Sequence, residues 1–235
     1  MNPVLVTSFW RQRLTSPIRV VLLGLAFGFP LLGAAFMHAG LSSLGDSVGI
    51  TLIFAVGMIG QDVSSGVLQL LFARPVRRIE YVVSRWLAVG TAAAAVGLLQ
   101  VLIAWAILSA YPNAPTTAQL GMFVGSRVLE CFGIAAVFTM LSCLIGGVGD
   151  LAIYFVGTVL GGVLELVAQT QHWTVLSRAA SELAGFLTPK LNLATLAATS
   201  PLPFFPIVSF VSTIALCLVV AVAVMNRKEL SYASG

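Results

Sequence analysis

Long apolar runs alternate with short polar gaps along the whole chain. A helix needs about twenty mostly apolar residues to cross the hydrocarbon layer of a bilayer. Six runs are candidates for such spans, and they cover residues 18–37, 48–60, 86–110, 122–145, 151–168 and 204–225. The second run is short, so we expect it to take residues from both sides. The pattern predicts an all-α membrane protein with six transmembrane helices.

Residues 169–203 do not fit this alternation. Apolar clusters at 183–187 and 191–196 are too short to span a bilayer, and Pro189 and two later prolines interrupt them. Such pieces are typical of re-entrant or interfacial helices. We therefore expect an external region of short re-entrant helices before the last span.

The composition indicates a lipid environment and a single domain. Of the 235 residues, 59% are hydrophobic and only 9% are charged, whereas soluble domains usually carry about 25% charged residues. The length suits one membrane domain, residues 1–235, without a separate soluble domain. The three cysteines, Cys131, Cys143 and Cys217, fall inside apolar runs, where cysteine is a small packing residue. The net charge of +4 resides in short gaps between the runs, which favours contact with anionic lipid and not nucleic acid.

The placement of arginine and lysine predicts the orientation in the cell membrane. If the N-terminus is cytoplasmic, the basic residues at or near that side are Arg11, Arg13, Arg19, Arg74, Arg77, Arg78, Arg85, Arg227 and Lys228. Those on the other side are Arg127, Arg178 and Lys190. Because basic residues concentrate on the cytoplasmic side, both termini are predicted to be cytoplasmic. Residues 1–17 mix Phe9 and Trp10 with arginines, which favours an interfacial amphipathic helix over a frayed tail or a cleaved signal peptide.

The segment 61–85 connects the second and third spans on the predicted cytoplasmic side. Asp62 and two nearby serines favour the start of a helix, and an apolar cluster over 67–72 follows. Pro75 then stops the helix, because the residue before a proline is pushed out of the helical region. Spacing alone leaves two alternatives, an interfacial helix in the lipid headgroups or a helix that seats on a partner protein.

This segment resembles the loop after the second span in ABC type-2 permeases. The matching residues are Asp62-x-x-x-Gly66-x-Leu68-x-x-Leu71-x-x-Arg74-Pro75-Val76-x-Arg78. The closing stretch Arg227-Lys228-Glu229-Leu230, the length, the number of spans and the N-terminal helix are also similar to that family. One departure is Gln61, where the family usually carries an acidic residue; Asp62 stands beside it.

The resemblance implies a permease subunit that pairs with a second copy or a paralogue and binds separate cytoplasmic ATP-binding subunits. In that family the loop forms a coupling helix, which seats in a groove of the ATPase and switches the membrane dimer between access states. The implied contact residues are Asp62, Gly66, Leu68, Leu71, Arg74, Pro75, Arg77 and Arg78. The turn at 146–150 would be a lesser contact, and residues 169–203 would be external helices that dip back into the membrane.

Motifs for catalysis are missing from the sequence. It contains no Gly-x-x-x-x-Gly-Lys-Ser/Thr loop, so we expect ATP hydrolysis on a partner chain and no enzyme activity here. The two histidines, His38 and His172, are too few for a metal site, and no cofactor is expected.

Three ionisable residues fall within or near apolar runs: Arg127, Glu130 and Glu165. Charges inside a span are costly, so each is a candidate for either a substrate contact or a structural pair. Arg127 and Glu130 are three positions apart and share a helix face, which predicts an internal pair. Glu165 is expected to pair with Arg127 or Arg178.

Two other classes of protein are alternatives to an ABC permease. A secondary transporter needs charged or broken helices at mid-membrane, ideally in repeated halves, and no such repeat is evident. A membrane enzyme needs a polar catalytic cluster at one depth, and the three intramembrane charges lack a nucleophile. The resemblance therefore favours an ABC exporter subunit, with a secondary transporter or another polytopic membrane protein not powered by ATP as the alternative. The apolar spans favour lipid-like, amphipathic or peptide cargo.

Overall fold

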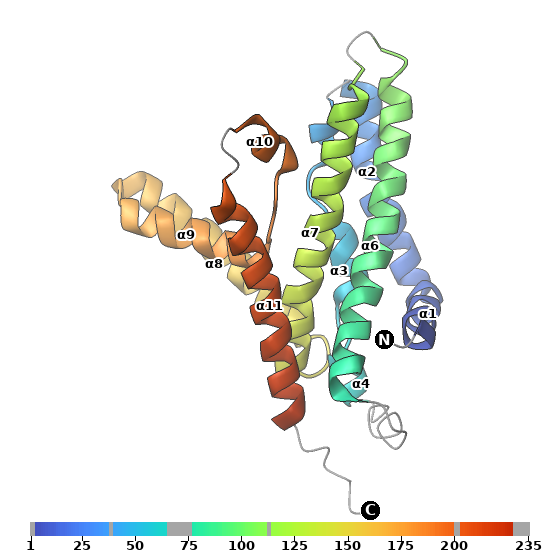
Figure 1. Cartoon of the computed structure of the whole chain (residues 1–235), viewed down its shortest axis with the longest axis vertical. Helices are drawn as coiled ribbons and strands as arrows, with labels where there is room; N and C mark the ends of the chain where they lie inside the picture. The colour runs from blue at the N-terminus through green and yellow to red at the C-terminus, as the bar shows by residue number, and fades with distance from the viewer. Residues whose placement is uncertain (1–2, 38–39, 65–76, 112–113, 200–202, 228–235) are drawn as a thin grey trace, which may run out of the picture.

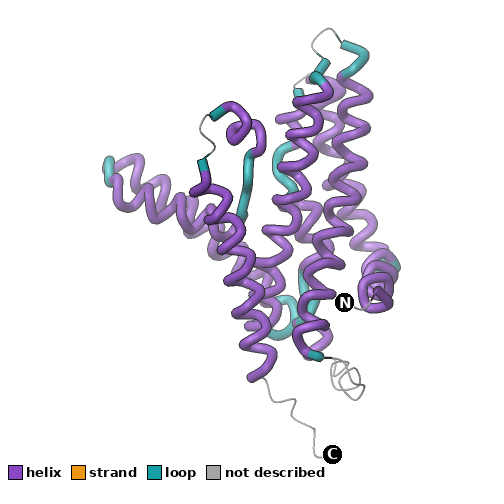
Figure 2. Tube along the Cα trace, in the orientation of Figure 1, coloured by secondary structure: helices purple, strands orange, loops and turns teal. Residues whose placement is uncertain are grey.

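The computed structural model is built from helices (Figure 1). It describes residues 3–37, 40–64, 77–111, 114–199 and 203–227. The elements are α1 (Pro3–Leu14), α2 (Pro17–Met37), the 3-10 helix η1 (Leu41–Leu44), α3 (Val48–Ala55), α4 (Gly60–Ser64), α6 (Arg78–Leu108), α7 (Thr117–Leu144), α8 (Gly149–Gln171), α9 (Thr174–Leu187), α10 (Leu193–Ala198) and α11 (Phe204–Arg227). Helices and loops account for all of these described ranges, which contain no strand (Figure 2). The all-α prediction is confirmed.

Six stretches of the described chain are long and apolar enough to cross a membrane. They are Pro17–Phe36, Leu41–Asp62, Arg78–Leu108, Thr117–Leu144, Gly149–Gln171 and Phe204–Arg227. The predicted number of spans is confirmed, and the second span takes residues from both sides of its apolar run. The third span begins at Arg78 and not near residue 86 as expected. The sequence pattern placed Arg85 outside the span, whereas the structure buries it in the helix.

The first described helix and the end of the last one lie toward the same end of the bundle (Figure 1). α1 and the last turn of α11 lie there, together with α4, the start of α6 and the α7–α8 turn. A backbone hydrogen bond from Gly147 N to Gly60 O, 3.0 Å long, joins that turn to α4. We call this the basal end, and we call the opposite end, which carries η1 and the α6–α7 connection, the distal end. An even number of spans returns the chain to the side on which it began, and the assignment of that side to the cytoplasm stays a prediction.

α6 and α7 form the centre of the bundle. Small residues, among them Ala88, Gly90 and Ala92, occupy much of the buried face of α6. A Cβ added at Gly90 would lie 2.5 Å from the ring of Phe132 on α7. The Trp86 indole donates to Phe132 O at 3.0 Å and packs edge-on against its ring, with 5.6 Å between the centroids. Because lipid tails are as apolar as the helices, close van der Waals contact of this kind holds spans together.

α8 and α9 diverge from the rest of the bundle as a pair of helices (Figure 1). Two glycines of α8 permit their close approach. A Cβ at Gly157 would meet Leu187 of α9 at 3.0 Å, and a Cβ at Gly161 would meet Leu183 at 3.7 Å. The outer faces of α8 and α11 carry many exposed large apolar side chains. Such faces suit contact with lipid or with another membrane protein.

Two short helices, α9 and α10, occupy most of the region 169–203. The first three residues of that region, 169–171, belong to the end of α8. α9 packs along α8, and α10 packs against α7. The depth of these two helices in the bilayer stays a prediction.

The second span is broken. α3 ends at Ala55 and α4 begins at Gly60, so residues 56–59 form a turn inside the span. Within this turn Gly57 has a φ of +66°, which glycine adopts at little cost because it lacks a Cβ. The turn lies inside the apolar run 48–60, which therefore comprises α3, the turn and the start of α4.

Candidate functional sites

The first polar cluster lies at the basal end. We call it the basal cluster, and it consists of Arg13, Asp62, Tyr81 and Arg85 around the ring of Phe9. The Asp62 carboxylate forms an ion pair with Arg85 and accepts a hydrogen bond of 2.6 Å from the Tyr81 hydroxyl. All five side chains are buried. Because an unpaired buried charge is very costly, Asp62 and Arg85 depend on each other.

Phe9 links α1 to this ion pair. Its ring is buried, and the guanidinium carbons of Arg13 and Arg85 each lie 4.9 Å from the ring centroid. A guanidinium over an aromatic face is attracted by the ring quadrupole. Arg13 also donates to Val56 O at 2.7 Å. Burial, and then the nearby charges of Arg19 and Arg85, lower the pKa of Arg13 to about 9, so Arg13 is a cation at neutral pH.

The break in the second span lies beside the basal cluster, and protein groups cap its backbone. Asp150 Oδ2 accepts a hydrogen bond of 2.8 Å from Gly57 N. The hydroxyl of Ser142 accepts from the amides of Ile59 and Gly60 at 3.1 and 3.0 Å. Backbone polar groups at membrane depth must find partners inside the protein. Together with the hydrogen bond from Arg13 to Val56 O, these contacts give the backbone groups named here partners inside the protein.

The structure places three of the eight residues expected to contact an ATPase. Asp62 is buried in the basal cluster, Arg77 is exposed, and Arg78 donates to Met225 O at 2.8 Å. The other five, Gly66, Leu68, Leu71, Arg74 and Pro75, lie outside the described residues. Asp150, in the turn expected as a lesser contact, is also buried. The side chains of Asp62, Arg78 and Asp150 hold elements of the bundle together, and the expected contact of this segment with an ATPase stays a prediction.

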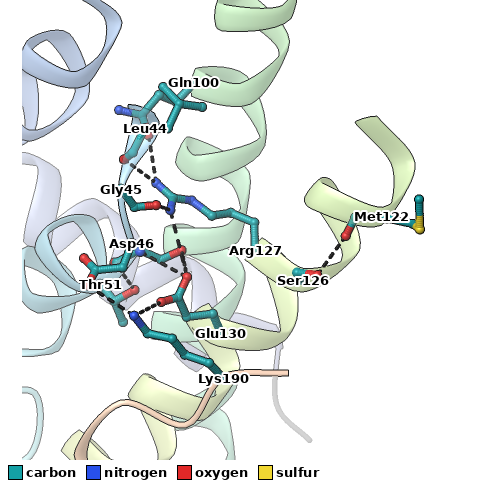
Figure 3. A network of polar contacts seen from close by, with 11 residues as sticks. Leu44, Gly45, Asp46, Thr51, Gln100, Met122, Ser126, Arg127, Glu130 and Lys190 are labelled. Atoms are coloured by element: carbon teal, nitrogen blue, oxygen red, sulfur yellow. Dashed lines mark hydrogen bonds and ion pairs between the residues drawn. The ribbon is translucent and has the colours of Figure 1, made fainter. Parts of the chain in front are cut away.

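The second polar cluster lies toward the distal end (Figure 3). We call it the distal cluster, and it consists of Asp46, Gln100, Arg127, Glu130 and Lys190. The pair that the spacing predicted is present, with 3.9 Å between Arg127 Nη1 and Glu130 Oε2. Arg127 also donates to Gln100 Oε1 at 3.2 Å and to Gly45 O at 2.5 Å. Both terminal nitrogens of Arg127 are thus engaged with protein oxygens.

Among the described residues, Glu130 accepts hydrogen bonds at one of its two carboxylate oxygens. Its Oε2 accepts hydrogen bonds from the backbone amide and the hydroxyl of Ser47, at 3.1 and 2.9 Å. Its Oε1 is buried and accepts no hydrogen bond within the described part of the chain. Lys190 Nζ lies 3.5 Å from Oε1, which is an ion-pair distance without hydrogen-bond geometry. The carboxylate therefore keeps one oxygen with unused capacity as an acceptor.

Lys190 belongs to the chain between α9 and α10. The sequence suggested only that it is a basic residue on the outer side. In the structure its Nζ lies 3.3 Å from Asp46 Oδ2 and 3.5 Å from Glu130 Oε1. Lys190 and Asp46 are 144 positions apart in the sequence, so no spacing rule could have paired them.

Glu165 joins neither cluster. It accepts hydrogen bonds from Gln169 Nε2 at 3.0 Å and from the Ser177 hydroxyl at 3.2 Å. The ion pair expected with Arg127 or Arg178 is not formed among the described residues, since Arg127 is engaged in the distal cluster. Glu165 instead ties α8 to α9.

A cavity of about 550 Å³ opens beside the distal cluster. Its polar wall includes Glu130, Lys190 and Asn192, and its apolar wall includes Leu41, Met122, Phe123 and Leu191. Ligand sites for small molecules typically have volumes of roughly 300–1,000 Å³ and combine apolar walls with a few polar groups. The distal cluster is therefore the better candidate for binding a ligand, and the basal cluster is the better candidate for a mechanical role.

No protein-family model matches the sequence, and no curated protein matches it. The class of the protein rests on its fold, which is that of an all-helical, multi-pass membrane protein with six spans in the described chain. A more specific function is a proposal from the residues and their geometry.

Proposed function

We propose that this chain is the membrane-spanning permease subunit of an ATP-driven ABC transporter and that it acts as an exporter. The segment 62–78, which bears the resemblance to the ABC type-2 coupling loop, leaves the second span at α4 and returns into α6. The ion pair between Asp62 and Arg85 joins the two helices that flank this segment. This contact is the main support for the proposal, because a push on the segment would reach two spans together.

The break in the second span would serve as the hinge for such a push. Hinges are a few residues at the ends of elements that absorb a change in backbone angles. Residues 56–59 fit this description, since they separate α3 from α4 and include Gly57 at a positive φ. Movement of α4 would then carry Arg85 and the start of α6, while α3 keeps its contacts in the bundle.

Two further contacts make the basal end a mechanical unit. The Trp10 indole donates to Ala88 O at 2.8 Å, which ties α1 to α6. Arg78 donates to backbone oxygens at the end of α11, at 2.8 Å to Met225 O and 2.9 Å to Asn226 O. A force applied at the basal end would therefore reach α1, α4, α6 and α11.

The proposal includes partners that the chain itself does not supply. A cytoplasmic ATP-binding subunit would hydrolyse ATP and press on the basal end, which faces the cytoplasm as the arginine placement predicts. A second permease copy or a paralogue would complete the pathway. The exposed apolar faces of α8 and α11 offer surface for that copy and for lipid.

A secondary transporter is a second candidate, because its class uses broken spans. In such transporters, unwound backbone at the break coordinates the coupling ion. Here Arg13 already donates to the carbonyl oxygen of Val56, so an ion would have to displace this guanidinium to use that oxygen, while Asp150 and Ser142 hold amide groups of the break. The break therefore suits a hinge better than an ion site. Solute transport driven by an ion gradient in ATP-free proteoliposomes would favour this second candidate instead.

The direct test is assembly with an ATP-binding subunit. The tagged full chain is co-expressed with ABC ATPase subunits from its own genome, purified in detergent and assayed for bound ATPase. We expect a stable complex. Replacing Leu68, Leu71 and Arg74 together by alanine should reduce bound ATPase by about tenfold or more, because interface energy concentrates in a few anchoring residues.

A matched control carries the same residue types at positions away from the segment. Leu99→Ala and Leu102→Ala lie on exposed parts of α6, and Arg11→Ala lies on the exposed part of α1. This triple variant should bind ATPase as the wild type does. A wild-type chain that captures no ABC ATPase contradicts the proposed function, and retained ATPase in the first triple variant contradicts the coupling assignment alone.

A further inference from the structure

We infer that the distal cavity binds a cationic amphiphile, a molecule with an apolar body and an amine head. Glu130 would anchor the ammonium group, and Lys190 would be a built-in competitor that the ligand displaces. The statement that this ligand is a transported substrate rests on the proposed function. The site itself rests on the geometry of the cavity and its charges.

The first step is the unused acceptor of Glu130, a residue that lines the cavity. The Glu130 side chain is 9% exposed, and its Oε1 accepts no hydrogen bond from the described residues. A buried carboxylate oxygen gains strongly from a donor, above all from a charged one. An ammonium group has three donors and no acceptor, so it meets this need directly.

The second step is that the present counter-ion is removable. The Lys190 side chain is 49% exposed, and it lies in the connection between two short helices. Its closer carboxylate, on Asp46, is also 49% exposed. Exposed ion pairs contribute little stability, because solvent screens them and flexible side chains lose entropy. Lys190 can therefore leave Glu130 and stay charged in solvent.

The third step is charge balance, which selects a cation over an anion. If a bound amine replaces Lys190, Glu130 keeps a positive partner and no buried charge is left uncompensated. The donors that remain for an anion are Lys190 and the buried Nε of Arg127, because the terminal nitrogens of Arg127 are held by protein oxygens. An anion on either cation would compete with Glu130 for it and weaken the compensation of a buried carboxylate, which is costly.

The fourth step is the shape of the cavity, which calls for an apolar body on the ligand. The walls away from the charges carry Leu41, Met122, Phe123 and Leu191. Removing apolar surface from water against these side chains favours an aliphatic or aromatic group over a purely polar amine. The volume of about 550 Å³ is large enough for a molecule of that kind.

The test measures binding without ATP or any partner protein. The purified full chain in lipid nanodiscs is titrated with octylamine, octanoate and octanol, which share one chain length and differ in the head group. Empty nanodiscs of the same composition correct for partition into lipid. We expect saturable binding of octylamine that is about tenfold or more tighter than that of octanoate or octanol.

Two charge variants should have effects of opposite sign. Glu130→Gln should weaken octylamine binding by about tenfold or more, because the anchoring charge is lost. Lys190→Gln should tighten it several-fold, because the internal competitor is gone. If the cavity were an anion site, it would bind octanoate more tightly than octylamine, and Lys190→Gln would abolish octanoate binding. That result, or an absence of saturable octylamine binding, overturns the inference.

A cavity-filling variant tests the place independently of charge. Met122→Trp should block octylamine, whereas Leu102→Trp on the exposed face of α6 should not. Both variants are checked for a single symmetric elution peak in size-exclusion chromatography. Glu130→Gln is checked in the same way, because Glu130 also accepts a hydrogen bond from Ser47 and its loss could affect folding. Unchanged binding in a well-folded Met122→Trp variant rules out the cavity. Failure here would leave the ATPase assembly unaffected, so the two proposals fail separately.

Discussion

The basal and distal clusters use similar chemistry in different surroundings. Each has a buried carboxylate paired with an arginine, Asp62 with Arg85 at the base and Glu130 with Arg127 toward the distal end. At the base, the partners are buried protein groups packed around a buried ring. Toward the distal end, Glu130 lines a cavity, and its buried Oε1 lies beside a half-exposed lysine. A buried charge whose partners are all fixed suits the transmission of force, whereas one with a removable partner suits exchange with a ligand.

Asp62→Asn should cause the largest loss of stability at either end. It leaves Arg85 buried without a counter-charge, which typically costs about 3–5 kcal/mol. Thermal unfolding of the purified chain in detergent should show a large drop in melting temperature. Adding Arg85→Met should recover part of this loss, because the uncompensated charge is then removed. If Asp62→Asn alone had the same melting temperature as the wild type, the basal ion pair would be dispensable for stability.

Glu130→Gln should cost less, about 2–3 kcal/mol for altered hydrogen bonding at a buried charged group. Arg127 loses its ion pair but keeps hydrogen bonds to Gln100 and Gly45, and Lys190 keeps Asp46, so each cation retains polar partners. The same thermal assay measures the difference from Asp62→Asn. Equal losses at the two ends would remove the distinction between a closed and an open cluster.

Gly60→Ala should destabilise the basal end by about 1–2 kcal/mol, because overpacking forces the backbone to shift. The added Cβ would clash with the backbone oxygen of Gly147. Gly40→Ala, on the wall of the distal cavity, is the matched control, since nothing lies within 4 Å of its Cβ. We expect the control variant to have the same melting temperature as the wild type. A reversed order of the two melting temperatures would contradict the tight packing assigned to the base.

Lys190→Gln should have the smallest effect on stability, below about 1 kcal/mol, because its ion pairs are half-exposed. The melting temperature should change little, and the dependence of stability on salt concentration should be slightly reduced. A large loss would mean that Lys190 is a structural partner of Glu130 and is not easily displaced.

Local patterns in the sequence were enough for some of these features. Apolar runs predicted six spans, because the thickness of the bilayer sets the length of each helix. The spacing of three between Arg127 and Glu130 predicted their pairing, because such residues share a helix face. The pattern wrongly placed Arg85 at the polar boundary of a span, because its partner Asp62 comes close only in the folded structure. It also failed at Glu165, whose neighbours come from α9 as well as from its own helix.

Contacts between distant segments depended on tertiary packing. The cap on the break in the second span needs Asp150, 93 positions beyond Gly57, and the distal cavity needs Lys190, 144 positions beyond Asp46. Hydropathy and spacing carry information over one or two helical turns, whereas these pairs form only when α7, α8 and the chain after α9 pack against the first spans. The number of spans and the motif before α6 could therefore be recognised from the sequence alone. The closed base and the open distal cavity arise from packing, because the partners of a buried charge are chosen by the fold that surrounds it.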